Sequence, residues 1–286
     1  MPVDYQVVWE VMKWPLAACL ILPPLLVYLG LHVVEREVIF VDLALAQVAT
    51  LGTCIALLIG YHFDDGITFW ISLGVTFIAA GLFSWSRTSE RRPVPQEAII
   101  GITFVVAAAG VILLLSRVQG GKEELEHLLT GDILNVSRSD VGLRALVFLP
   151  LAAFYAAFHK KFALISSAPA RAFAQGLRVR LWDFLFYAAF AIVVVSFVRV
   201  AGVLLTFAYL IVPAVCAVTL AESWVSRLII GWGISAVASL LGLWLSYKLD
   251  LPTGASIVVV CGVALIFVSI FAVVRPRPTT GTERRV

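Results

Sequence analysis

Apolar residues occur along this chain in long blocks that short polar segments separate. A helix needs about 20 apolar residues to cross the hydrocarbon core of a bilayer. Blocks of about that length cover residues 16–34, 39–60, 67–86, 97–116, 142–161, 181–198, 200–221, 226–247 and 253–274. Hydrophobicity is continuous within each block, whereas a strand of a membrane β-barrel alternates. The pattern predicts an all-α, polytopic transmembrane helical bundle of about eight to nine spans, in one domain over residues 1–286.

One boundary between spans rests on a short motif. The apolar sequence from 181 to 221 is interrupted only by "RVAG" at 199–202. Such a run is too long for a single crossing. We therefore expect a tight turn near Arg199 and Gly202. We also expect Pro23-Pro24 to kink the first span.

The composition also indicates a membrane protein, and the basic residues orient it. The chain is 61% hydrophobic and 14% charged, whereas soluble domains are about 45–50% apolar and about 25% charged. Lys and Arg are enriched on the cytoplasmic side of membrane proteins. With the N-terminus outside and the C-terminus in the cytoplasm, fourteen of the 21 basic residues lie inside. These are Arg36, Arg87, Arg91, Arg92, Lys160, Lys161, Arg171, Arg178, Arg180, Arg227, Arg275, Arg277, Arg284 and Arg285.

Three segments are predicted to lie outside the membrane. Residues 117–141 form an outside loop, in which "KEELEHLL" is polar enough for a surface helix ending near Gly131. Residues 276–286 form a flexible cytoplasmic tail. Residues 163–180 form the longest inside connection, where Ser166 or Ser167 caps a short helix, Pro169 begins it and Gly176 ends it. That helix either anchors to lipid or docks a cytoplasmic partner.

Common catalytic and nucleotide-binding motifs are missing from the sequence. It contains no G-x-x-x-x-G-K-[ST], so it does not bind ATP through a P-loop. It also lacks H-E-x-x-H, G-x-S-x-G and G-x-G-x-x-G. We therefore expect a transport protein rather than an enzyme, with no nucleic-acid partner.

Two polar residues, Asp42 and Gln47, interrupt the second span. Charged residues within a span usually face the bundle interior or a water-filled path. On a helix, Asp42 shares a face with Ala46 and Ala49, which suits either a lumen or a tight helix contact. Gln47 lies on another face. We interpret Asp42 as part of a cation path; the alternative is that it reaches the interface or caps the helix.

Polar residues in the outside loops are weaker candidates for cation binding. "YHFDDG", at 61–66, groups His62, Asp64 and Asp65, and Asp132 lies in the loop 117–141. Such groups can collect cations at the mouth of a pathway. An ordinary solvated turn explains the first cluster better, and the same interpretation applies to Asp132.

Five segments, in order along the chain, resemble the permease subunits of ABC importers for zinc, manganese or iron. They are "EREVIFVDLALAQVATLG" (35–52), "HLLTGDIL" (127–134), "SSAPARAFAQGLRV" (166–179), "VRVAGVLLTFAYLIVPAVCAVTLA" (198–221) and "LDLPTGASIVVVCGVALIF" (249–267). The resemblance covers nearly the whole chain, and it rests on the order of the segments more than on any one of them.

The resemblance implies a pump with several subunits in a bacterial or archaeal cell (inner) membrane. A homodimer of permeases would form the pathway, cytoplasmic ABC ATPase subunits would supply energy, and an extracellular or periplasmic protein would deliver the metal. The divalent metal would be the transported substrate, with no tightly bound cofactor. The segment around Pro169, Ala172, Gln175 and Gly176 would then couple to the ATPase.

One departure from the family pattern concerns the metal. The family usually has Asp, three residues, then His in this span, whereas here Asp42 is followed at that spacing by Ala46. Imidazole is a good zinc ligand, and the carboxamide of Gln47 is a harder, weaker one. A metal chelate is therefore an alternative substrate. A stand-alone carrier driven by an ion gradient is a third hypothesis, although no convincing internal repeat supports it.

Overall fold

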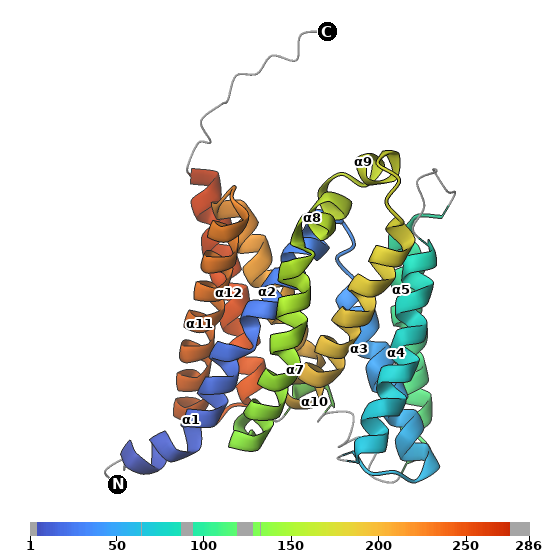
Figure 1. Ribbon diagram of the computed structural model, residues 1–286. Coiled ribbons are helices and arrows are strands. Elements are labelled where there is room, and N and C mark those ends of the chain that lie inside the picture. Colours follow the sequence, from blue (N-terminus) through green and yellow to red (C-terminus); the bar gives the residue numbers. More distant parts are fainter. Residues whose placement is uncertain (1–4, 64, 87–93, 119–127, 132, 275–286) are drawn as a thin grey trace.

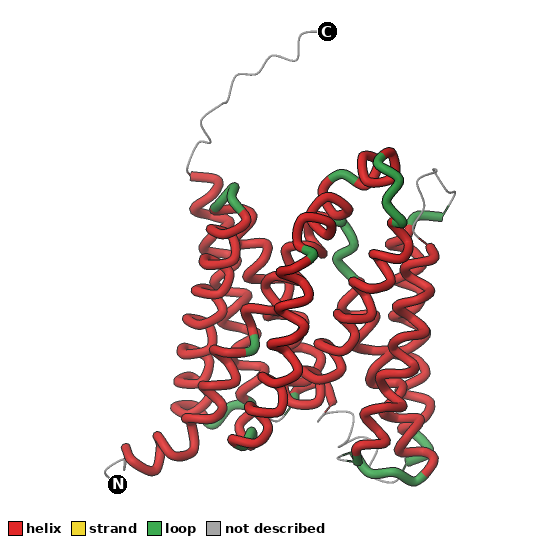
Figure 2. Tube along the Cα trace, viewed as in Figure 1, coloured by secondary structure: helices red, strands yellow, loops and turns green. Residues whose placement is uncertain are grey.

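The computed structural model describes residues 5–63, 65–86, 94–118, 128–131 and 133–274, and it shows a helical bundle (Figures 1 and 2). Within these ranges the regular structure is entirely helical. The elements are α1 (Tyr5–Ile21), α2 (Pro23–Glu35), α3 (Val41–Ile59), α4 (Gly66–Ser86), α5 (Gln96–Leu115), η1 (Ile133–Asn135), α7 (Arg138–Ala157), α8 (His159–Ser167), α9 (Pro169–Ala174), α10 (Val179–Leu220), α11 (Trp224–Leu249) and α12 (Thr253–Val274).

Eight helical stretches among the described residues are long and apolar enough to cross a membrane. The first, Met12–Glu35, joins α1 to α2 with a break at Leu22, where the predicted Pro23-Pro24 kink begins. The span predicted at 142–161 is displaced toward the N-terminus. Its helix begins at Arg138 because the Ser137 side chain accepts the Asp140 N–H and the Asp140 carboxylate accepts the Ser137 N–H.

The break predicted near Arg199 and Gly202 is found at Gly202, inside the 42-residue α10. Gly202 has φ 72° and ψ 170°, a backbone conformation open essentially only to glycine. Both ends of α10 lie at the same end of the bundle: Asp183 near its start bonds Arg36, and Trp224 just after its end packs on the neighbouring His32. The chain therefore reverses direction at Gly202, and α10 supplies two crossings.

Glycines bring three distant segments together at this reversal. A Cβ on Gly202 would lie 2.4 Å from the backbone nitrogen of Gly131. A Cβ on Gly254 would lie 2.4 Å from the carbonyl oxygen of Thr130. The segments around Gly131, Gly202 and Gly254, which belong to three of the five family-like stretches, therefore meet backbone to backbone.

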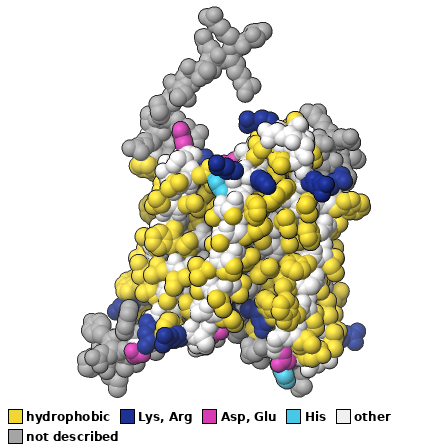
Figure 3. All heavy atoms as spheres, in the orientation of Figure 1, with side chains coloured by type: hydrophobic (Ala, Val, Ile, Leu, Met, Phe, Trp, Pro, Cys, Tyr) yellow, Lys and Arg dark blue, Asp and Glu magenta, His cyan; other side chains and the backbone are white. Residues whose placement is uncertain are grey.

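The spans differ in how deeply they are buried. In the most apolar window of α10, 78% of residues are buried, against 11% in that of α12, although both helices are strongly apolar. Figure 3 shows hydrophobic side chains covering the middle of the visible face, with Lys and Arg toward its two ends. Lipid or another apolar helix is the environment that such a surface requires. α10 therefore forms the interior of the bundle, and α12 lies on its outer surface.

The two ends of the bundle carry different elements (Figure 1). We call the end that holds α8, α9 and the start of α10 the α9 end, and the opposite end, where α1 begins, the α1 end. Contacts at the α9 end join Glu35 to Arg227 and the Ser84 hydroxyl to the Arg180 carbonyl. Several basic residues assigned to the cytoplasmic side thus lie together at the α9 end. The proposed tail 276–286 lies outside the described residues.

Candidate functional site

Asp42 lies in the first turn of α3, at the α9 end of the bundle. Its exposed fraction is 1%, and neither carboxylate oxygen has a side-chain partner in the described part of the chain. Phe40 occupies the N-cap position, and no side-chain cap bond is present. Asp42 therefore neither reaches out to an interface nor caps α3. The helix dipole favours a negative charge here, and burial opposes it.

The helix face that Asp42 begins is a tight helix contact. Ala46, Ala49 and Thr53 are all buried. A Cβ on Gly52 would lie 2.6 Å from the Cα of Ser72 on α4, and the Ser72 hydroxyl donates to the Ala49 carbonyl at 2.7 Å. Small residues allow helix backbones to approach this closely in membranes. This face could have lined a lumen or formed a tight helix contact. From Ala46 to Thr53 it forms a tight helix contact.

The described residues contain no group of three or more His, Cys, Asp or Glu side chains that could hold a metal ion. Gln47 is 9% exposed and lies on a different face of α3 from Asp42. Asp42 is thus a single buried carboxylate that offers oxygen ligands, without a preformed cage around it. Such a group suits a cation that passes rather than one that resides.

The loop between α3 and α4 holds two of the outside candidates. The Asp65 carboxylate accepts the His62 backbone N–H at 2.7 Å, and the His62 carbonyl accepts the Thr68 hydroxyl at 2.7 Å. His62 itself is exposed. These contacts are those of a turn in which Asp65 satisfies the backbone. Asp64 and Asp132 lie outside the described residues.

The predicted coupling segment forms α8 and α9. Pro169 begins α9 as predicted, and Gly176, at φ 70°, ends it. The Gly176 N–H donates to Phe173 and the Leu177 N–H to Ala172, which is a Schellman motif. Pro169, Gln175 and Gly176 are exposed, whereas Ala172 is buried against Ile165, Val179 and neighbouring apolar residues.

The predicted serine cap of this helix is wrong. Ala168 is the N-cap residue of α9, and no side-chain cap bond is present. The Ser167 hydroxyl donates within its own helix to Ala163. Ser166 is buried, and its hydroxyl bonds the side chains of His32 in α2 and of Arg36, the residue just after α2. Both serine hydroxyls therefore bond groups other than the first backbone N–H groups of α9.

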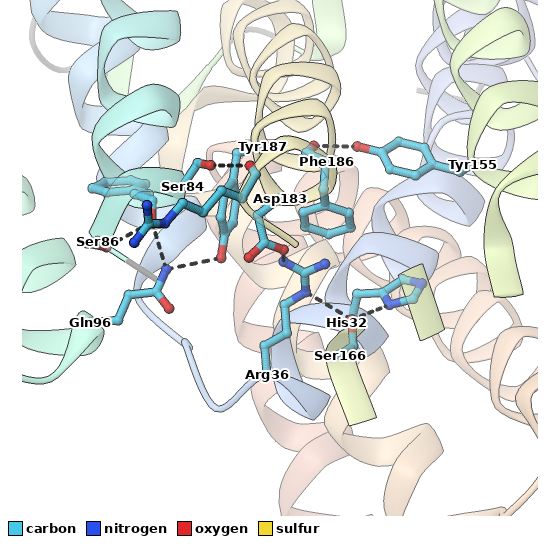
Figure 4. A network of polar contacts seen from close by, with 12 residues as sticks. His32, Arg36, Ser84, Ser86, Gln96, Tyr155, Ser166, Asp183, Phe186 and Tyr187 are labelled. Atoms are coloured by element: carbon cyan, nitrogen blue, oxygen red, sulfur yellow. Dashed lines mark hydrogen bonds and ion pairs between the residues drawn. The ribbon is translucent and has the colours of Figure 1, made fainter. Parts of the chain in front are cut away.

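A buried polar network joins α2, α8 and α10 beside this segment (Figure 4). The Arg36 Nη1 donates to Asp183 Oδ1 at 2.8 Å, and both side chains are fully buried. The Arg36 Nε donates to the Ser166 hydroxyl at 2.9 Å, and His32 Nδ1 lies 2.9 Å from the same oxygen. The guanidinium also stacks on Phe186, with its carbon 3.9 Å from the ring centroid.

The charge of Arg36 is stable in this environment. Burial by itself lowers the pKa of the guanidinium, but the negative charge of Asp183 and the neighbouring Tyr187 outweigh it, so the pKa of Arg36 is raised. The cation therefore persists at every physiological pH. Arg36 and Asp183 form an ion pair between the end of α2 and the start of α10.

Further polar contacts hold the start of α10 to its neighbours. The Tyr155 hydroxyl of α7 donates to the Phe186 carbonyl at 2.9 Å. The Gln96 amide of α5 donates to the Phe83 carbonyl at 3.0 Å and contacts the Tyr187 hydroxyl. Figure 4 shows these groups around Asp183. The first turns of α10 are therefore the point where most spans meet at the α9 end.

Sequence reasoning missed Asp183 and His32 as members of this network. Asp183 is an acidic residue at the edge of an apolar block. Asp42 was identified because it has the same kind of position, so this feature could also have identified Asp183. Its partner Arg36 lies 147 positions away, so only the fold identifies the pair. His32 is one of four histidines in the sequence, and nothing in its local sequence distinguishes it.

Comparison with known proteins gives the same architecture. The manganese import system permease protein ScaB of Streptococcus gordonii is 30% identical over 249 residues, which are 85% of this chain and 84% of that protein. A probable iron transport system membrane protein of Haemophilus influenzae is 26% identical over 272 residues, 94% of this chain and 96% of that one. The solved structure of PsaBC from Streptococcus pneumoniae in complex with Fab superposes with a TM-score of 0.77 at 22% identity, covering 94% of this chain and 95% of that chain.

A family model matches almost the entire chain. The model describes the ABC 3 transport family, and it aligns with residues 8–272. This range contains seven of the eight described spans and all but the last two residues of the eighth, together with Asp42, the α8–α9 segment and the glycine contacts at Gly202. The chain therefore belongs to the ABC 3 transport family, as a multi-pass permease subunit of an ABC transporter in the cell membrane.

Proposed function

We propose that this permease imports a divalent metal ion and that Asp42 contacts the ion on its way through the bundle. The observation that carries the proposal is the buried Asp42 carboxylate, whose two oxygens have no side-chain partner among the described residues. A buried carboxylate without a protein partner is costly to keep ionised. A passing cation supplies the missing partner.

Manganese fits this chemistry better than zinc. Mn²⁺ accepts carboxylate, carbonyl and water oxygens, whereas zinc and iron also favour imidazole. Ala46 places a methyl group where an imidazole would follow Asp42 one helical turn later. A relative that covers most of the chain is named a manganese import permease. The proposed substrate is therefore Mn²⁺.

The α9 end supplies a surface for the ATPase. Pro169, Ala170, Arg171, Ala174 and Gln175 are exposed on α9, and six residues of helix are too few to fold without a support. Ala172 provides that support by packing against the bundle. We place the α9 end in the cytoplasm, the α1 end outside, and a substrate-binding protein on the α1 end.

A second copy of the chain completes the proposed transporter. The pathway of an ABC permease requires two membrane subunits, and we propose a homodimer. ATP hydrolysis is assigned to separate subunits, since the sequence has no P-loop.

A metal chelate is the second candidate substrate, and Ala46 is the observation that favours it. A chelated ion brings its own ligands, so it does not need an imidazole beside Asp42. Membership of an ABC family leaves no place for the third hypothesis, a stand-alone carrier driven by an ion gradient.

The test uses the complete transporter in nanodiscs, with its ATPase and its binding protein. ATP hydrolysis is measured with Mn²⁺, Fe²⁺ or Zn²⁺ as the only transition metal. Stimulation by Mn²⁺ above the other two is the expected result. Stimulation by zinc alone would refute the choice of metal, and no stimulation by any free ion in an assembled complex would favour a chelate.

A further inference from the structure

Ser166 is the only described residue of α8 whose side chain bonds both α2 and the loop after it. Arg36 donates its Nε–H to the Ser166 oxygen, and His32 Nδ1 lies at the same distance of 2.9 Å from that oxygen. A hydroxyl offers one hydrogen and two acceptor positions, so it can serve both partners at once. All three side chains are buried. Water cannot readily replace any of these contacts.

The other side of Arg36 holds α10. Its Nη1 donates to Asp183 at 2.8 Å, and its guanidinium stacks on Phe186. Figure 4 shows Arg36 between Ser166 and Asp183, with His32 adjacent. A displacement of α8 therefore acts on a side chain that is clamped to α10 and belongs to the end of α2.

The same residue lies close in sequence to Asp42. Only residues 37–41 separate Arg36 from Asp42, and α3 begins at Val41. The turn after α2 is fixed by the Val38 N–H, which donates to the Val33 carbonyl. A shift of Arg36 is thus passed along a short, hydrogen-bonded connection to the first turn of α3.

We propose that Ser166 is the positioning residue that transmits movement of the α8–α9 segment to the end of α2 and the Asp42 turn. Ile165 of α8 and Ala172 of α9 pack together with Val179 at the start of α10, so α8 and α9 are in direct contact with each other. Ser166 links this segment to Arg36, and Arg36 links it to α3 and α10. This inference rests on the proposed function of α9 as the ATPase contact.

A purely structural role is the competing explanation, and a coupling ratio separates the two. The experiment compares Ser166→Ala with Ser167→Ala in proteoliposomes that contain the whole transporter. Ser167 is the matched control, because it is adjacent and exposed, and among the described residues its hydroxyl bonds the Ala163 carbonyl of α8. The measured quantity is ATP hydrolysed per Mn²⁺ imported, together with the melting temperature of each complex.

Ser166→Ala removes two hydrogen bonds and leaves the buried Arg36 Nε–H without a partner, so we expect about five- to tenfold more ATP per ion imported and a lower melting temperature. Ser167→Ala should match wild type in both. Ser166→Thr keeps the hydroxyl and should restore the coupling ratio. An unchanged ratio for Ser166→Ala, in a complex that imports Mn²⁺, would overturn the inference and leave the proposed function intact.

A weaker variant protects the test against a failure to assemble. Ser166→Cys keeps the size of the side chain but bonds more weakly. If the alanine variant does not assemble, an intermediate ratio for cysteine supports the proposal and a wild-type ratio overturns it. A wild-type complex that hydrolyses ATP but imports no metal would refute the proposed function, and with it the coupling role.

Discussion

Asp42 and Asp183 are two aspartates near the starts of core helices, at the same end of the bundle, and both are buried. Asp183 is matched by Arg36 at 2.8 Å, and the pair is supported by Ser166 and Phe186. Asp42 has 1% exposure and no side-chain partner in the described structure. The Asp183 carboxylate forms an ion pair that joins two helices, whereas the Asp42 carboxylate pairs with no side chain among the described residues.

The difference indicates a structural role for Asp183 and makes Asp42 a candidate for a role in transport. The buried ion pair of Arg36 and Asp183 holds α2 against α10, and removing one partner leaves an uncompensated charge. An unpartnered buried carboxylate contributes nothing of that kind. Such a group in a membrane span is a functional candidate because stability alone would not retain it.

The largest expected effect comes from breaking the paired carboxylate. Asp183→Asn leaves the Arg36 guanidinium buried without its counter-charge, so we expect a loss of about 3–5 kcal/mol of stability. The melting temperature of the purified permease measures the loss. The double variant Arg36→Met with Asp183→Leu removes both charges and should recover most of it. A double variant as unstable as the single one would contradict this account.

Asp42→Asn should affect metal uptake strongly and stability little, which is the opposite of the expectation for Asp183→Asn. The amide keeps the shape and removes a charge that has no partner, so we expect stability within about 1 kcal/mol of wild type, or slightly above it. Metal uptake should be abolished. Uptake assays and melting curves on the same preparations check both statements. Retained uptake would remove Asp42 from the proposed path, and a loss of stability like that of Asp183→Asn would make it structural.

Ala46→His sharpens the comparison by giving Asp42 an imidazole neighbour. The new ligand should shift the ratio of zinc to manganese uptake by about tenfold toward zinc. The larger side chain should also cost about 1–3 kcal/mol in this packed contact. Gln47→His is the matched control, since it adds the same group on a different face of α3. An equal shift from both variants would show that the position beside Asp42 is not special.

The smallest expected effect lies in the connection between the two charges. Glu37, just after Arg36, has φ 57°, in the left-handed region where Gly176 and Gly60 end other helices. Glu37→Gly should relieve that strain and stabilise the protein by about 0.5–1 kcal/mol. Glu37→Ala, which retains a Cβ, should give no such gain in melting temperature. A gain from alanine as well would assign the effect to the lost charge.

Asp42 and the ends of α9 could be predicted from the sequence because each depends on local features of the chain. Asp42 could be identified because a charge within a span is conspicuous in any apolar block. The ends of α9 at Pro169 and Gly176 were local backbone chemistry, and both were found as predicted. The serine cap failed because Ser166 had partners on α2 and its loop, more than a hundred positions away.

Hydrophobic blocks determined the helices, their approximate bounds and the membrane as solvent, because each depends only on neighbouring residues. Gly202 marked the reversal for the same reason. The tertiary structure decided which apolar helices are interior and which lie on the outer surface of the bundle, since α10 and α12 are both strongly apolar. It also decided which buried charge has a partner. Arg36 meets Asp183 only when α2 packs on α10, and no such partner reaches Asp42 in the described structure.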